Sequence, residues 1–234
     1  MERWLLQPSD AEWQAITLSL KVALVGVAAS LPLGLAIAWL LARRRFPGKA
    51  LFEGIVHMPL VVPPVVVGYG LLLFFGRRGP VGAWLYDHFG ITLIFTWKGA
   101  ALAAAVMGFP LMVQAIRLSI EAVDRKLEAA ARTLGAGPLG VFFSITVPLT
   151  LPGILAGSVL AFARSLGEFG ATIVFVGNIP GETRTIPIAI YTLTQQPDGD
   201  LPALRLSIIA LVLALLALIA SEALARRIHA RIRG

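Results

Sequence analysis

The chain is 234 residues long, with 57% hydrophobic residues, 14% charged residues and a formal net charge of +7. Soluble domains carry about 25% charged residues, so this chain has too little polar surface for water, and we expect it to lie in a membrane. Its positive charge is then assigned to membrane topology and not to nucleic acid binding. Cysteine is absent, which excludes disulfide scaffolds, thiol catalysis and Cys-ligated metal sites.

Apolar stretches long enough to cross a bilayer predict an all-α integral membrane bundle of about five transmembrane helices. In chain order the five stretches are 16–42, 51–75, 99–116, 147–176 and 204–220. Proline removes a backbone donor and kinks a helix, and three prolines fall close together at Pro59, Pro63 and Pro64. Glycines in the same stretches allow close helix contacts. We therefore expect a bent, closely packed bundle.

Basic residues set the expected orientation. Arg43, Arg44, Arg45 and Lys49 follow the first stretch, and four more arginines follow the last. Because cytoplasmic segments carry an excess of Lys and Arg, the N-terminus is expected outside and the C-terminus inside. The predicted organisation is a short external segment at 1–14, a transmembrane domain at 15–222 and a basic cytoplasmic tail at 223–234. Twelve Lys and Arg fall on the expected inside segments and six on the outside ones, and the basic pair Arg77–Arg78 is the main feature that opposes this orientation.

The hydrophilic segment 117–146 predicts two short helices. In the first, Asp124 is a suitable N-cap and Gly135 a suitable left-handed C-terminal residue, with Leu127, Ala130, Ala131 and Leu134 on one face. The second restarts at Gly137-Pro138 and runs through Phe143. A face of small residues suits docking onto a partner, while Glu128 and Arg132 remain free to pair. An ordinary amphipathic helix on the membrane surface is the alternative.

Two charges within the fourth stretch indicate a functional or structural ion pair. Arg164 and Glu168 lie four residues apart, on one helical face, where a charge costs about 2.5–3.5 kcal/mol to insert. The pair either fixes the helix in the bundle or lines a path for an anion, with Arg164 as counter-charge and Ser165 as hydrogen-bond donor. The candidate residues of the translocation pathway or gate are therefore the two prolines of the expected bend and the charged segment: Pro63, Pro64, Arg164, Ser165 and Glu168.

Several kinds of chemistry have no support in the sequence. The three histidines, His57, His88 and His229, are far apart, so no metal site is expected. Gly48-Lys49 lacks the upstream glycine of a phosphate-binding loop, and no G-x-S-x-G or H-E-x-x-H motif occurs, so we expect no enzyme activity. The chain therefore cannot bind a nucleotide's phosphates by itself, and any energy that it uses would come from a partner or, in a gradient-driven carrier or channel, from an ion gradient.

The segment Glu128–Gly135, followed by Ile145-x-Val147-Pro148, resembles the cytoplasmic signature of binding-protein-dependent ABC importer permeases. That signature is Glu-Ala-Ala, three residues, Gly, nine residues, Ile-x-Leu-Pro. Here its Glu position falls on Ala129, with Glu128 one place early, and its Leu is Val147. The resemblance implies that 117–146 holds a coupling helix for the ATPase. Its contact residues would be Leu127, Glu128, Ala130, Ala131, Arg132, Leu134 and Gly135.

Beyond this signature, nearly the whole chain resembles molybdate ABC transporter permeases. The resemblance is carried by 12–15, 46–50, 58–69, 161–171 and 178–185. It implies a type I transmembrane fold working as a homodimer in the bacterial inner membrane. The implied partners are two cytoplasmic ATPase subunits, which bind ATP and Mg, and an extracytoplasmic molybdate-binding protein; no cofactor is implied in this chain. Permeases for sulfate, thiosulfate or tungstate are the alternative.

Overall fold

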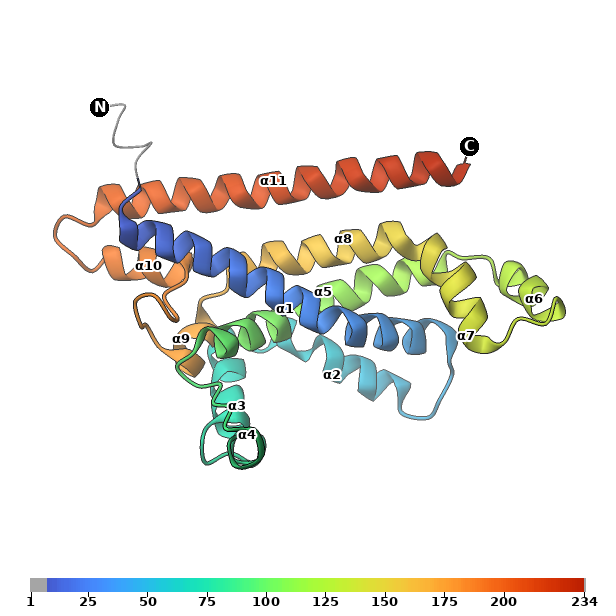
Figure 1. The fold of residues 1–234 in the computed structure, drawn as a ribbon, viewed down its shortest axis with the longest axis horizontal. Coiled ribbons are helices and arrows are strands. Elements are labelled where there is room, and N and C mark those ends of the chain that lie inside the picture. Colours follow the sequence, from blue (N-terminus) through green and yellow to red (C-terminus); the bar gives the residue numbers. More distant parts are fainter. Residues whose placement is uncertain (1–7, 234) are drawn as a thin grey trace.

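The computed structural model describes residues 8–233, and between these residues the chain forms helices and connections without a β-strand. The helices are α1 (Asp10–Arg43), α2 (Lys49–Val61), α3 (Pro64–Phe75), α4 (Pro80–Phe89), α5 (Trp97–Glu121), α6 (Arg125–Thr133), α7 (Pro138–Val141), the π-helical turn η1 (Phe142–Thr146), α8 (Val147–Leu166), α9 (Gly170–Val176), α10 (Ile186–Leu193) and α11 (Asp200–Arg233). The long helices run side by side along the molecule (Figure 1). Residues 1–7 of the expected external segment, residue 234 of the expected tail, and the tail side chains from 224 onward lie outside what is described.

Within the described residues, four helices are long and apolar enough to cross a membrane. They are Asp10–Arg43, Trp97–Glu121, Pro138–Leu166 and Asp200–Ala220, and the bent pair α2–α3 supplies a fifth crossing if it is counted as one span. The expected all-α membrane bundle of about five transmembrane helices is therefore confirmed. The last helix continues without a break through the expected tail as far as Arg233.

The second apolar stretch, expected as one span at 51–75, is broken in the structure. It bends by 114° between α2 and α3. Val62, in front of Pro63, is extended, because a residue before proline is pushed out of the helical region. Pro64 then starts α3 at a position where its missing N–H costs nothing. Beyond the break, α3 and α4 project away from the long helices (Figure 1).

The fourth stretch, expected at 147–176, differs at both ends. Its helix starts earlier, because α7 continues through η1 into α8, and it ends at Leu166. The carboxylate of Glu168 accepts a hydrogen bond from the backbone N–H of Ala171 at 2.8 Å, in the first turn of α9. That bond, at a turn containing Gly167, starts a separate helix where one continuous span was expected.

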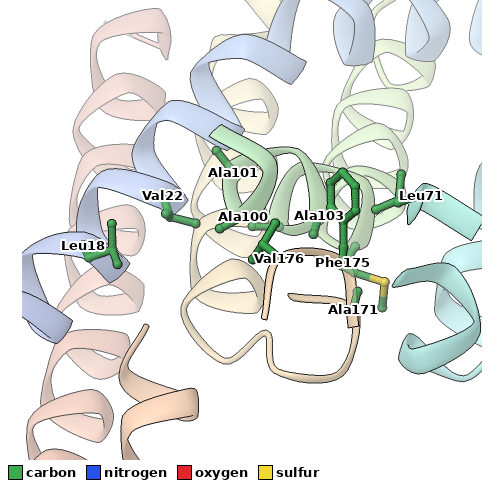
Figure 2. Close-up of a cluster of buried hydrophobic side chains, with 11 residues drawn as sticks. Leu18, Val22, Leu71, Ala100, Ala101, Ala103, Ala171, Phe175 and Val176 are labelled. Atoms are coloured by element: carbon green, nitrogen blue, oxygen red, sulfur yellow. The ribbon is translucent and has the colours of Figure 1, made fainter. Parts of the chain in front are cut away.

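Small residues set the distances between the long helices, as expected. A methyl group at Gly26 would lie 2.8 Å from the carbonyl oxygen of Ala101, and one at Gly108 would lie 2.9 Å from that of Ala161. Such contacts bring α1, α5 and α8 close together. Figure 2 shows Phe175 and Val176 of α9 packed against the alanines of α5. The core is therefore densest around α5.

Two ion pairs define the ends of the bundle. Glu12 pairs with Arg205 at 2.6 Å, which holds the starts of α1 and α11 together. Arg43, the last residue of α1, pairs with Glu128 of α6 at 2.9 Å at the opposite end. The C-terminal end of α11 lies toward the same end as α6 (Figure 1). The two termini of the described chain therefore lie at opposite ends of the bundle.

Candidate functional site

The α6 segment forms as its sequence predicts. The side chain of Asp124 accepts a hydrogen bond from the N–H of Lys126 at 2.8 Å and caps the helix start. At the other end Gly135 adopts a φ of +89°. The N–H groups of Gly135 and Ala136 donate to the carbonyls of Arg132 and Ala131, which closes the helix in a Schellman motif. Both predicted caps of this short helix are thus confirmed.

The second predicted helix starts at Pro138, as expected, but it does not end near Phe143. It passes through the π-helical turn η1 and continues as α8 to Leu166. The segment after α6 is consequently one continuous helical body with a membrane span.

Glu128 is not free to pair with a partner, in contrast to the expectation from the sequence. It is buried, its carboxylate lies 2.9 Å from the guanidinium of Arg43, and it accepts a hydrogen bond from the hydroxyl of Thr146 at 3.1 Å. Arg43 also donates to the carbonyl of Val123 at 3.1 Å. A carboxylate this far from water needs such partners. Glu128 therefore ties α6 to α1 and to η1.

The other side chains of α6 leave an apolar surface at this end of the molecule. Leu127 is 49% exposed and Leu134 is 88% exposed. Ala130 and Arg132 are exposed, and Ala131 is half-buried. Leu139 and Phe143 of the following helix are also exposed.

Arg164 and Glu168 form the expected ion pair, with 2.7 Å between guanidinium and carboxylate. Their environments differ, because the side chain of Arg164 is 28% exposed and that of Glu168 is 2% exposed. Ser165 is buried and donates its hydroxyl proton to the carbonyl of Ala104 on α5 at 3.1 Å. The expected role of Ser165 as a donor to an anion is therefore corrected to a bond between helices.

The structure brings the proline bend and the Arg164–Glu168 pair to one place. A methyl group at Gly68 of α3 would lie 2.5 Å from the carbonyl oxygen of Ala171 in α9, and one at Gly170 would lie 2.8 Å from Pro64. Only glycine permits this approach of α3 to α9. As a result, Pro63 and Pro64 lie beside the turn that holds Glu168.

Three charged contacts were not found by sequence reasoning. They are Arg43 with Glu128 and Thr146, Glu12 with Arg205, and Arg117 with Glu53 and Glu121. Each contact joins helices that are far apart in the chain. The bond from Arg117 to Glu121 is the exception, because it lies within α5. A charge near the end of an apolar stretch was the one available signal, and it does not specify the partner.

The described residues show no group of three His, Cys, Asp or Glu side chains that could hold a metal ion. His57 contacts the carbonyl of Glu53, and His88 contacts that of Trp84, each within its own helix. The side chain of His229 lies outside the described part.

Comparison with known proteins places this arrangement in a family. A profile of binding-protein-dependent transport system inner membrane components matches residues 30–230, and the chain belongs to this family of multi-pass membrane proteins. It is 66% identical over 218 residues to the molybdenum transport system permease protein ModB of Escherichia coli, covering 93% of this chain and 95% of that protein. The ModB protein of Haemophilus influenzae is 55% identical over 221 residues, covering 94% and 96%.

A solved structure has the same fold. The chain matches a bacterial alginate ABC transporter, solved in complex with an alginate pentasaccharide-bound periplasmic protein, with a TM-score of 0.74. The match covers 96% of this chain and 81% of that one, at 21% identity. At this identity the similarity shows the fold alone.

Proposed function

We propose that the chain is the membrane-spanning permease subunit of an ATP-driven ABC importer that carries molybdate across the bacterial inner membrane. The observation that carries this proposal is the 66% identity, over 93% of the chain, to the molybdenum transport permease of Escherichia coli. The chain itself is not an enzyme in this proposal. ATP and Mg bind to a separate ATPase subunit.

The proposed assembly is a homodimer with two cytoplasmic ATPase subunits and an extracytoplasmic molybdate-binding protein. The α6 end is the cytoplasmic end, because Arg44, Arg45, Lys49, Arg125 and Lys126 lie on the segments gathered there. The N-terminus is then outside and the C-terminus inside. The exposed Leu127 and Leu134 support docking of the ATPase on α6.

Movement of the ATPase subunits would reach the membrane through two connections. Glu128 ties α6 to the end of α1 through Arg43 and to η1 through Thr146. The turn η1 continues directly into α8, whose far end carries Arg164 next to the α3–α9 contact. Displacing α6 therefore shifts α1 and α8 together and changes the packing at the proline bend.

Arg164 is the proposed contact for the anion during passage. Molybdate is a tetrahedral dianion, and the guanidinium keeps N–H donors beyond the one used by Glu168. The neighbouring carboxylate reduces the positive potential at this position. Weak binding is what passage requires, because a strong site would retain the ion. Specificity then rests mainly with the binding protein.

Uptake of labelled molybdate in cells without their own molybdate system tests this proposal. The chain is expressed with and without its ATPase and binding protein, and excess sulfate is added as competitor. We expect uptake that requires all three components and resists sulfate. Uptake abolished by modest sulfate would move the substrate to sulfate, and uptake by this chain alone would contradict the ATP-driven assembly.

A further inference from the structure

A pocket lined by arginines lies between the end of α1, α6 and α7–η1. Its volume is about 520 Å³, and its polar wall contains Arg43, Arg44, Arg125, Arg132 and Glu128. A second hollow of about 470 Å³ shares the first three of these arginines and adds Arg45 and Lys49. We call the two together the basic pocket. On α6 its lining residues are Arg125, Glu128, Ala129 and Arg132, and the exposed Leu127 does not line it.

The charges of the basic pocket are not balanced within the chain. Its single carboxylate, Glu128, is used by Arg43. Among the described residues, Arg44, Arg125 and Arg132 take part in no ion pair. The side chain of Arg43 is only 8% exposed, and its Nε is buried without a hydrogen-bond partner. A buried donor of this kind indicates a missing acceptor.

The other wall of the basic pocket is aromatic and apolar. It contains Trp39, Val141 and Phe142, and the rings of Trp39 and Phe142 pack edge to face with centroids 6.0 Å apart. The guanidinium of Arg44 lies 5.5 Å from the centroid of Trp39. Tryptophan is enriched where a span meets the lipid headgroups, and the span of α1 ends at Arg43.

We propose that the basic pocket binds the phosphate of an anionic phospholipid. The arginines supply charge-assisted donors to the phosphate oxygens, and the aromatic wall contacts the glycerol and the first carbons of the acyl chains. Basic hollows between transmembrane helices at the cytoplasmic side suit such headgroups. The bound lipid would bridge α1 and α6 alongside Glu128, so it would hold α6 in position. This site is separate from the transport path and from the proposed substrate.

Native mass spectrometry of the purified permease tests the site directly. The protein is titrated with phosphatidylglycerol, with phosphatidylcholine and, in a third arm, with inorganic phosphate alone. The test variant is Arg44→Gln/Arg125→Gln, which removes two charges shared by both hollows. The matched control is Arg77→Gln/Arg78→Gln, which removes two charges next to α4. Size-exclusion chromatography checks that each variant remains folded.

We expect the wild type and the control to prefer phosphatidylglycerol over phosphatidylcholine. The test variant should lose about 30-fold in phosphatidylglycerol affinity, a factor of roughly five for each basic residue. Equal losses in the test and control variants would overturn the proposal. Saturation by inorganic phosphate with no preference for the lipid would assign the pocket to a free anion instead. In a final arm the partner ATPase is added to the lipid-bound permease; loss of the lipid there would overturn the proposal and assign the arginines to that subunit.

Discussion

Glu128 is the residue on which the position of α6 depends most. Its carboxylate and the guanidinium of Arg43 are each more than nine-tenths buried, and removing one partner leaves a buried charge without compensation. We predict that Glu128→Ala lowers the free energy of unfolding by about 3–5 kcal/mol. Thermal unfolding of the purified protein in detergent measures this loss.

Lys126→Ala is the matched control for that prediction, because Lys126 lies on the same helix and is exposed. Its effect on stability should stay within about 0.5 kcal/mol. If the two variants unfold at the same temperature, the Arg43–Glu128 pair does not anchor α6, and the proposed connection to α1 is wrong.

Arg164 and Glu168 can be separated into a structural and a substrate role by removing both charges. In Arg164→Gln/Glu168→Gln no buried charge is left unpaired, and an amide at position 168 can still accept from Ala171. We predict a folded protein of nearly wild-type stability whose molybdate uptake falls at least about tenfold, the effect of losing roughly 1.4 kcal/mol of stabilisation of the passing anion. Uptake assays on matched amounts of protein measure it; normal uptake would show that the pair only holds the helices.

At the level of helices, the C-terminal turn of α6 offers the sharpest test of coupling. Gly135 has a φ of +89°, and a side chain there would meet no atom within 4 Å, so a substitution acts through the backbone alone. A β-branched residue resists this conformation, whereas asparagine tolerates it. We predict that Gly135→Val lowers uptake about 5- to 30-fold, equivalent to roughly 1–2 kcal/mol of backbone strain. ATP hydrolysis should continue.

Gly135→Asn is its control and should transport almost normally. Uptake and ATP hydrolysis are measured together on the reconstituted importer, so that the ratio of the two reports coupling. Normal uptake in Gly135→Val would contradict the proposal that α6 transmits movement from the ATPase to the membrane helices.

The helices and their caps were predictable because they depend on neighbours in the chain. Asp124, Gly135 and Pro138 act within one turn, and the sequence places each of them correctly. The break at Pro63 was visible as a cluster of prolines, but its angle of 114° depends on the contact of Gly68 with α9. No local pattern contains that contact.

The candidate site was less predictable than the fold, because its partners are distant in sequence. Glu128 and Arg43 are 85 residues apart, and Ser165 donates to Ala104 across 61 residues. Helical spacing correctly paired Arg164 with Glu168, four residues away. It could not show that Glu128 is buried or that the hydroxyl of Ser165 is already used.

At the scale of the whole molecule, the orientation in the membrane can be tested with single cysteines, since the chain has none. Gln196 lies in the exposed connection before α11, and Pro47 lies in the exposed connection between α1 and α2, at the opposite end. We predict that a membrane-impermeant maleimide labels Gln196→Cys in intact spheroplasts and labels Pro47→Cys only after permeabilisation. The reverse pattern would contradict the proposed orientation, in which basic segments face the cytoplasm.

The central claim is that this fold moves an anion only when a partner ATPase drives it. The most direct measurement is molybdate uptake into proteoliposomes that contain the permease, its ATPase and its binding protein, with ATP or a non-hydrolysable analogue on the ATPase side. Ion gradients across the same vesicles form a parallel arm. The account predicts uptake with ATP and none with the analogue or with a gradient alone. Uptake driven by a gradient through the permease alone would contradict it.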